Sequence, residues 1–317
     1  MATLLVCSAT DDLSTLCSAL EAAAAAPEGQ VRDLKVVLWP AAFDPWDVVA
    51  VAAWNPPAGL LPALPALKFV ASIGAGIEHI LQCPDLPEEV PITRIVDTQQ
   101  AQGMAEYVLW AALHFHRGFD EILARQTSRT WRVPPQAAAS AFRVGIMGLG
   151  GMGTQVAKRL RDNGFSVSAW ARRAHELQGV QTFAGSTPPA EFLALSDMVV
   201  CLLPLTAQTT GLCNAEFFAA MKPGAAFVNA GRGQQVVTGD LLAALDAGQL
   251  RGAVLDVFDT EPLSQQSPLW SHPKVIVTPH MASAATDASI ACQIVSNVQR
   301  VRSGQAIENT VTREQGY

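Results

Sequence analysis

Three kinds of side chain that could act together on a keto acid each follow a predicted strand. Arg232 stands in VNAGRGQ, the carboxylates Asp256, Asp259 and Glu261 stand in LDVFDTEPL, and His280 stands in VIVTPHMAS. In open α/β sheets, ligands bind outside the carboxyl ends of the strands, so we expect these groups to gather there. Arginine can bind a carboxylate or polarise a carbonyl, and histidine can protonate a developing alkoxide. A carboxylate can hold the imidazole and favour its charged form.

A glycine-rich turn precedes these residues in the chain. GLGGMG fits G-x-G-x-x-G as Gly148, Gly150 and Gly153, and it lies between the strand-like RVGIM and a helical segment. The first glycine permits a tight turn, the second lets the backbone approach a pyrophosphate, and the third lets helix and strand pack closely. The helix N-terminus then supplies an anion site. This context predicts a dinucleotide-binding unit, the alternative being a purely structural glycine turn.

The second strand of this unit indicates which cofactor is preferred. About 20 residues beyond the glycines, an Asp or Glu is expected to bind a ribose 2′-hydroxyl. The stretch VSAWARRAHE has Arg172 and Arg173 there instead. Guanidinium groups match a 2′-phosphate in charge and in donor geometry. We therefore expect NADP(H) to be preferred and NAD(H) to be possible; the alternative is a solvated basic turn beside an NAD ribose.

The composition limits the possible partners. Half of the 317 residues are hydrophobic, 15% are charged and the net charge is −7. An acidic chain of this kind is not expected to bind nucleic acid or a membrane surface, and no uncharged run is long enough to span a bilayer. The six cysteines show no metal or disulfide spacing, so we expect no metal site. The opening MATLLVCSA lacks a positively charged signal-peptide start, and we expect a cytoplasmic protein with reduced thiols.

The chain contains two predicted alternations of strands and helices, which carry these residues. Apolar runs predict strands at 3–9, 47–54, 68–74 and 90–96, and then at 143–147, 166–170, 197–203, 225–230, 252–257 and 274–278. We expect one long helix at 104–124 and a last helix at about 285–303. Continuous apolar strands alternating with helices predict the α/β class, with two doubly wound parallel sheets. Because the glycine motif opens the second alternation, the nucleotide domain is expected to be inserted into another domain.

Together, GLGGMG, NAGRG, GAVLDVFDTEPL and SPLWSHPKVIVTPHMAS resemble the D-isomer-specific 2-hydroxyacid dehydrogenases. Within that family, the WNPP-like loop, GVQTFAG, LLAALDAG and the final GY are similar to the bacterial glyoxylate/hydroxypyruvate reductases of the A type. The resemblance implies a Rossmann nucleotide domain at 98–285. It also implies a flavodoxin-like substrate (catalytic) domain made of 1–97 and 286–317.

The resemblance also implies roles for individual residues. The catalytic set would be Arg232, Glu261 and His280, with Glu261 as the partner of His280. The cofactor would contact Gly148, Gly150, Gly151, Met152, Gly153, Arg172, Arg173, Leu203, Pro204, Ala230, Gly231, Asp256, His280 and Ala282, with Asp256 at the nicotinamide end. The substrate would contact Arg232, Trp54 and the backbone N–H groups of the IGAGIEH loop, at Gly74, Ala75 and Gly76.

Residues 104–135 would form the arm of a homodimer, with Trp131 reaching towards a site. The expected activity is NADPH-dependent reduction of small 2-keto acids, glyoxylate and hydroxypyruvate, to 2-hydroxy acids, with His280 as proton donor. Bulky Trp54 and Trp131, if they line the pocket, would favour substrates of this size. Two alternatives remain: a non-catalytic NAD(P)-sensing scaffold of the corepressor kind, and an NAD-dependent D-2-hydroxyacid dehydrogenase with a larger substrate.

Overall fold

The chain folds into two compact units. A computed structural model describes residues 2–26, 31 and 33–313. One unit combines Met1–Asp97 with Ala284–Tyr317, and the other is Thr98–Ser283. The assignment of substrate and nucleotide roles to these units stays a prediction, as do the domain boundaries that go with it. The terminal Gly316 and Tyr317, which entered the resemblance, lie outside the described residues.

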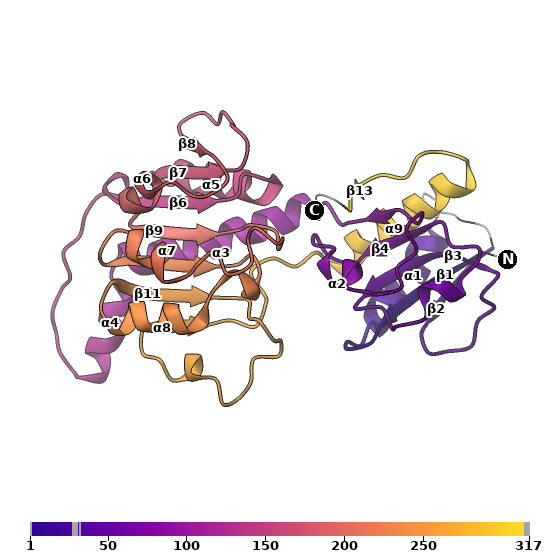
Figure 1. The fold of residues 1–317 in the computed structure, drawn as a ribbon, viewed down its shortest axis with the longest axis horizontal. Helices are drawn as coiled ribbons and strands as arrows, with labels where there is room; N and C mark the ends of the chain where they lie inside the picture. The colour runs from indigo at the N-terminus through magenta and orange to yellow at the C-terminus, as the bar shows by residue number, and fades with distance from the viewer. Residues whose placement is uncertain (1, 27–30, 32, 314–317) are drawn as a thin grey trace. The chain divides into compact units, whose positions relative to one another are not determined.

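The unit formed by the two chain ends contains, in its described residues, a six-stranded sheet (Figure 1). Its strands are β1 (Ala2–Ser8), β2 (Leu34–Leu38), β3 (Val48–Trp54), β4 (Phe69–Ser72), β5 (Ile92–Thr93) and β13 (Thr310–Val311). Their order is β13-β5-β4-β3-β1-β2, parallel except for the β13–β5 pair. The sequence 2-1-3-4-5 is the flavodoxin-like order.

Helices cover both faces of this sheet. They are α1 (Ser14–Ala25), α2 (Glu78–Leu81) and α9 (Asp287–Arg302). α1 and α9 come from opposite ends of the chain, yet they pack side by side (Figure 1). Leu4 on β1 is buried in the core with α1 and α9, whereas its neighbour Leu5 is buried in the core on the other face. Continuous apolar strands are therefore explained by burial on two faces.

The second unit contains a seven-stranded parallel sheet. Its strands are β6 (Arg143–Met147), β7 (Ser166–Ala171), β8 (Gln181–Ala184), β9 (Met198–Cys201), β10 (Ala225–Asn229), β11 (Leu250–Leu255) and β12 (Val275–Val277). The order β12-β11-β10-β9-β6-β7-β8 contains the Rossmann pattern 3-2-1-4-5-6, with one further strand, β12, at the edge. The strand order reverses between β6 and β9, the point at which such sheets bind nucleotides.

This sheet is also covered on both faces. Its helices are α3 (Thr98–His116), α4 (Phe119–Thr127), α5 (Gly151–Asp162), α6 (Ala190–Leu195), α7 (Ala215–Ala220) and α8 (Thr238–Asp246). α3 and α5 pack on one face, where Ile146 is buried. α6, α7 and α8 pack on the other face, where Met147 is buried (Figure 1). The predicted fold class, two doubly wound α/β domains, is confirmed.

The single helix predicted at 104–124 is wrong. The chain forms α3 and α4 instead, because Gly118 adopts a left-handed conformation with φ of 72° and a right-handed helix cannot continue through it. The apolar pattern continues across the break, which is why it predicts one helix. In the parts of the chain that the structure describes, no helix is long and apolar enough to cross a membrane.

Candidate active site

The side chains of His280 and Glu261 form a close pair. His280 Nδ1 lies 2.7 Å from Glu261 Oε2, and about a third of each side chain is exposed. With the carboxylate on Nδ1, the other ring nitrogen, Nε2, is the one that can serve a ligand. Of the three carboxylates that the sequence left open, Glu261 is thus the partner of His280.

His280 is held by the turn that follows β12. Its N–H donates to the Asp256 carbonyl oxygen at 2.8 Å, and its φ of 51° turns the chain sharply. The Asp256 carboxylate accepts bonds from the Thr278 hydroxyl at 2.6 Å and from the N–H groups of Met281 and Ala282 at 2.9 and 2.8 Å. Buried Asp256 therefore anchors the loop that carries His280. A carboxylate has about four acceptor sites, so one remains beyond these three bonds.

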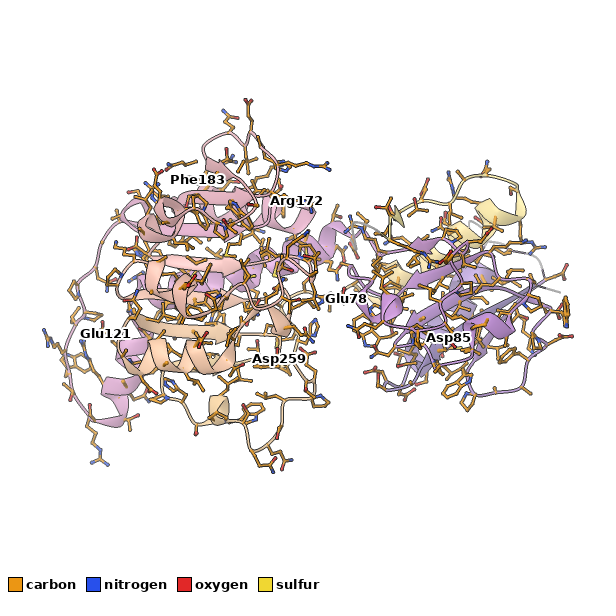
Figure 2. All side chains as sticks on the ribbon, in the orientation of Figure 1. Glu78, Asp85, Glu121, Arg172, Phe183 and Asp259 are labelled. Atoms are coloured by element: carbon orange, nitrogen blue, oxygen red, sulfur yellow. The ribbon has the colours of Figure 1, made fainter. Side chains whose placement is uncertain are left out.

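Glu261 is fixed by its own chain before it meets the histidine. Its Oε1 accepts the N–H of Phe258 at 2.9 Å. Burial acts to raise the pKa of Glu261, but the hydrogen bonds from His280 and Phe258 and the charges of His280 and Arg232 outweigh it. The net result is a lowered pKa, so the carboxylate is ionised at neutral pH. Asp259, two residues earlier, is exposed instead (Figure 2).

Arg232 begins a short 3₁₀ turn, Gly233–Gln235, directly after β10. Its side chain is half-buried, and Nη1 donates to the Gly231 carbonyl at 2.7 Å. The buried Asn229 amide accepts the N–H of Gly231 at 3.1 Å and donates to the Arg232 carbonyl at 2.9 Å. Because β10, β11 and β12 are neighbours in a parallel sheet, their ends bring Arg232, Glu261 and His280 to one edge.

The glycine turn lies at the corresponding end of β6. Gly148 has a φ of 104°, and its N–H donates to the Trp170 carbonyl at 2.8 Å. A Cβ atom on Gly153 would lie 1.9 Å from the Gly148 carbonyl oxygen, so helix α5 and the turn approach as closely as glycine allows. A Cβ atom on Gly150 or on Gly151 would meet nothing within 4 Å.

These observations fit a dinucleotide. Gly150 and Gly151 present bare backbone to open space at the N-terminus of a twelve-residue helix, where unpaired N–H groups attract phosphate. Met152, half-buried, follows in the first turn of α5. Arg172 and Arg173 come directly after β7 and are exposed (Figure 2 labels Arg172). The turn thus has space for a pyrophosphate, with cations on the adjacent strand end.

The other predicted cofactor residues follow strands at the same edge. Leu203 and Pro204 follow β9, Ala230 and Gly231 follow β10, and Ala282 follows β12. The Leu203 and Pro204 carbonyls accept the two amide hydrogens of Gln235 at 2.9 and 3.0 Å.

The predicted substrate residues of the other unit lie together at the ends of β3 and β4. Trp54 is half-buried and stacks on His79, with ring centroids 3.9 Å apart. The Ser72 hydroxyl accepts the N–H of Gly74 at 3.1 Å and is 2.6 Å from the Gly76 carbonyl. These bonds shape the loop that holds Gly74, Ala75 and Gly76.

Sequence reasoning missed several residues of these two regions. Asn229, Gln235 and Ser72 are buried and hydrogen-bond the backbone of predicted site residues, and buried His79 packs against the Trp54 ring. The one available signal was their place next to strand ends, which does not distinguish a holding residue from a core residue. Trp131 is 99% exposed, so its predicted reach towards a site is not made within its own chain in this structure.

The fold, the glycine turn and the acid–base pair define a nucleotide-dependent dehydrogenase. The chain belongs to the D-isomer specific 2-hydroxyacid dehydrogenase family: the family model for its NAD binding domain matches residues 109–282. Glyoxylate/hydroxypyruvate reductase A of Klebsiella pneumoniae (strain 342) is 38% identical over 92% of this chain and 94% of its own length. The Serratia proteamaculans protein of the same name is 39% identical over 92% and 93%.

Solved structures agree with this assignment. A D-isomer specific 2-hydroxyacid dehydrogenase from Xanthobacter autotrophicus Py2, in complex with NADPH and MES, has a TM-score of 0.92 and 38% identity over 100% of this chain and 99% of that one. An NADPH-dependent glyoxylate/hydroxypyruvate reductase from Sinorhizobium meliloti, in complex with NADP and sulfate, has a TM-score of 0.89 and 34% identity over the full length of both chains. The predicted family is confirmed.

Proposed function

We propose that this protein is an NADPH-dependent reductase that converts the small 2-keto acids glyoxylate and hydroxypyruvate to 2-hydroxy acids. The observation that carries the proposal is the 2.7 Å contact between His280 and Glu261, at the sheet edge that also carries Arg232. An acid–base pair beside a guanidinium suits the reduction of a carbonyl next to a carboxylate. The names of the relatives support the same substrates and cofactor.

In the proposed mechanism, the chain's groups bind the substrate and deliver a proton. When bound, the reduced nicotinamide supplies a hydride to the keto carbon. His280 donates the proton on Nε2 to the keto oxygen, which becomes the hydroxyl of the product. Ionised Glu261 fixes the orientation of the His280 ring through Nδ1 and leaves Nε2 to serve the substrate. A proton from solvent then restores His280, so each turnover consumes one reduced cofactor and one proton.

Arg232 is proposed to bind the substrate carboxylate and its keto oxygen. A guanidinium offers a planar set of donors that matches a carboxylate bidentately. The N–H groups of Gly74, Ala75 and Gly76 are also proposed to contact the substrate. Trp54, held against His79, is proposed to restrict substrate size.

The residues proposed to hold the cofactor are those at the strand ends. The N-terminus of α5, with Gly150 and Gly151, would hold the pyrophosphate. Arg172 and Arg173 would hold the 2′-phosphate, which makes NADP(H) the preferred cofactor and leaves NAD(H) possible. Asp256 would receive a donor from the nicotinamide end while anchoring the His280 loop.

A homodimer through residues 104–135 is part of the proposal. Trp110, Leu113, Phe119 and Leu123 are large apolar side chains exposed on α3 and α4. With His114 and Ile276, they line an apolar depression of about 400 Å³. Such patches on a soluble enzyme mark interfaces, and a second copy presenting the same face would cover it.

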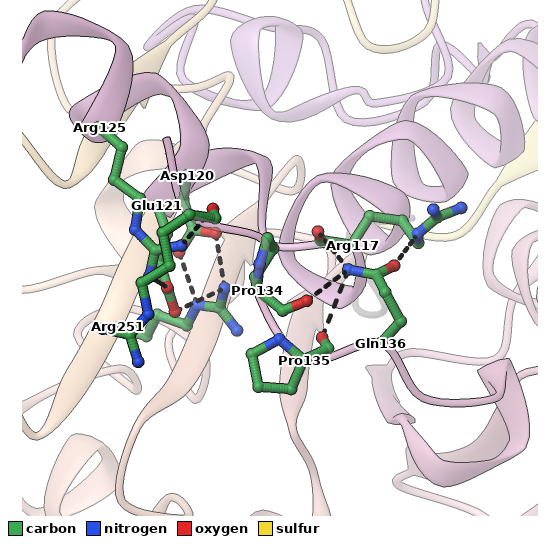
Figure 3. A network of polar contacts seen from close by, with 9 residues as sticks. Arg117, Asp120, Glu121, Arg125, Pro134, Pro135, Gln136 and Arg251 are labelled. Atoms are coloured by element: carbon green, nitrogen blue, oxygen red, sulfur yellow. Dashed lines mark hydrogen bonds and ion pairs between the residues drawn. The ribbon is translucent and has the colours of Figure 1, made fainter. Parts of the chain in front are cut away.

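A polar network holds this arm against the nucleotide unit (Figure 3). Arg251 on β11 binds Asp120 through two nitrogens, at 2.5 and 2.6 Å. Arg125 bridges Glu121 at 2.6 Å and the Arg132 carbonyl at 3.0 Å. A face fixed in this way is preorganised for association.

The six free cysteines, five of them buried, support the further proposal that the enzyme works in the reducing cytoplasm.

Turnover by the purified protein tests the proposal against its alternatives. Glyoxylate, hydroxypyruvate and a series of larger 2-keto acids are each supplied with NADPH and with NADH. We expect the highest kcat/KM with NADPH and the two small substrates. Binding of NADPH with no turnover would favour the scaffold, and a preference for NADH with a bulky keto acid would favour the other dehydrogenase.

A further inference from the structure

We propose that Gln235 is a positioning residue for the reaction: its buried side-chain amide holds the backbone of Arg232 to the loop that follows β9. This inference rests on the proposed role of Arg232 in binding the keto acid. Gln235 lies three residues beyond Arg232, at the end of the 3₁₀ turn, and its side chain is fully buried.

All the hydrogen-bonding capacity of this amide is used. Gln235 Oε1 accepts the N–H of Arg232 at 2.9 Å and the thiol of Cys201 at 3.3 Å. Gln235 Nε2 donates to the carbonyls of Leu203 and Pro204, at 2.9 and 3.0 Å. A carboxamide has two acceptor lone pairs and two donor hydrogens, and here each has a partner.

The surroundings leave the amide no freedom to move. A Cβ atom on Gly231 would lie 2.5 Å from Gln235 Oε1 and 2.9 Å from the Leu203 carbonyl oxygen. The Gln235 backbone is bonded as well: its N–H donates to the Arg232 carbonyl at 3.3 Å, and its carbonyl accepts the N–H of Cys213 at 2.9 Å. One residue thus joins the backbone of Arg232, which follows β10, to the end of the neighbouring strand β9.

Replacing the amide with an apolar group of similar size would therefore act on Arg232. In Gln235→Leu, the Arg232 N–H loses its acceptor, and the carbonyls of Leu203 and Pro204 lose their donors. Buried groups left without partners shift to find new ones or remain unpaired at a cost. A displaced Arg232 backbone carries its guanidinium away from the substrate, and a shift of about 1 Å can reduce a rate about 100-fold.

The experiment compares Gln235→Leu with a matched control, Gln249→Leu. Gln249 also donates to two backbone carbonyls, those of Phe218 and Met221 at 3.0 and 2.9 Å, but it lies after α8, at the other end of the sheet. Melting temperatures measure the structural cost of each change. With NADPH saturating, we expect Gln235→Leu to lower kcat/KM for glyoxylate about 10- to 100-fold, with a raised KM, and Gln249→Leu to keep the parent value.

A double-mutant cycle with Arg232→Ala shows whether Gln235 acts through Arg232. If it does, adding Gln235→Leu to Arg232→Ala changes kcat/KM by less than about threefold, because the group it positions is gone. An equal loss in both backgrounds, or a loss in kcat with an unchanged KM, would assign Gln235 to stability alone and overturn the inference. Parent-like turnover by Arg232→Ala itself would overturn the proposed role of Arg232, and this inference with it.

Gln235→Glu keeps the test decisive if Gln235→Leu does not fold. The glutamate still accepts the Arg232 N–H, and its protonated form can donate to the Leu203 or Pro204 carbonyl. Burial beside carbonyl oxygens raises the pKa of such an acid, so the donor is present at low pH and lost as pH rises. We expect the kcat/KM of Gln235→Glu, relative to the parent, to fall with rising pH and that of Gln249→Glu to stay level. If the kcat/KM of Gln235→Glu relative to the parent is as independent of pH as that of Gln249→Glu, the inference is overturned.

Discussion

The carboxylate of Glu261 contacts its own turn through one oxygen and His280 through the other. Oε1 accepts the N–H of Phe258 at 2.9 Å, and Oε2 lies 2.7 Å from His280 Nδ1. The carboxylate is therefore oriented by the backbone three residues before it, and the imidazole is oriented by the carboxylate. Removing the carboxylate should therefore disturb the imidazole.

Glu261→Gln should lower kcat/KM for glyoxylate about tenfold or more. The amide offers one acceptor oxygen in place of two, so it cannot accept from the Phe258 N–H and from His280 Nδ1 through separate oxygens, and the imidazole loses its fixed orientation. Steady-state kinetics with saturating NADPH measure this, and a kcat/KM equal to that of the parent would refute the positioning role of Glu261.

The lowered pKa of Glu261 predicts how the stability of the fold changes at acid pH. The stabilisation from its ionised form is fully present above the ordinary glutamate pKa and is lost as pH falls through the lowered one. The melting temperatures of the parent and of Glu261→Gln should therefore converge only at pH values below the ordinary pKa of glutamate. Convergence already near neutral pH would contradict the ionised pair.

Gly150→Ala and Gly153→Ala should fail in different ways. A methyl group on Gly150 enters open space, so the fold should keep its melting temperature while the pyrophosphate is obstructed and the KM for NADPH rises. On Gly153 it would lie 1.9 Å from the Gly148 carbonyl oxygen, so the cost should be about 1–3 kcal/mol of folding stability. An unchanged NADPH affinity in Gly150→Ala would show that the cofactor does not bind at this turn.

Replacing Arg172 and Arg173 with alanine should weaken NADPH selectively. A hydrogen bond to a charged group contributes about 1.5–3 kcal/mol. Both side chains are exposed, so salt weakens each contact and about tenfold per arginine is expected. The double variant should raise the KM for NADPH about 100-fold and leave NADH nearly unchanged.

Lys158→Ala, which removes an exposed positive charge from α5, is the control for general charge effects. Added salt should narrow the parent's preference for NADPH. Equal losses with both cofactors would show that the two arginines serve the fold rather than the phosphate.

The proposed dimer predicts that Leu123→Glu dissociates the protein. Leu123 is 56% exposed on α4, and an unpaired charge buried at the interface should raise the dimer dissociation constant by about 100-fold or more. Leu195→Glu, a partly exposed leucine at the end of α6, should remain dimeric. Light scattering measures the masses of both variants and of the parent. A monomeric parent, or a dimeric Leu123→Glu, would contradict a dimer interface formed by residues 104–135.

The sequence predicts the two sheets well because their strands are buried on both faces. Runs such as RVGIM and AAFVN each contain a single polar residue, at one end, and both become strands. β2 and the exposed β8 were missed, since Lys35 interrupts the first and polar residues begin the second. The break at Gly118 was missed because periodicity records which face is apolar and does not record φ.

Part of the candidate site could also be predicted from the sequence, because its residues follow recognisable strands. Arg232, Glu261 and His280 follow strands, and parallel pairing brings strand ends together, so their neighbourhood could be inferred. Gln235 could not be found in this way. Its proposed positioning role depends on the Leu203 and Pro204 carbonyls, 31–32 residues earlier, and on burial that only the packed turn creates. No pattern within the chain marks such a contact.

The variant His280→Asn removes the proposed proton donor. Asparagine removes the proton donor but keeps a polar side chain of smaller volume on the same backbone. In the presence of NADPH and glyoxylate, kcat should fall by about 10²–10⁴, the usual contribution of general acid catalysis. NADPH binding, measured by fluorescence titration, should stay as in the parent. Turnover close to that of the parent, with the fold and cofactor binding intact, would contradict the account.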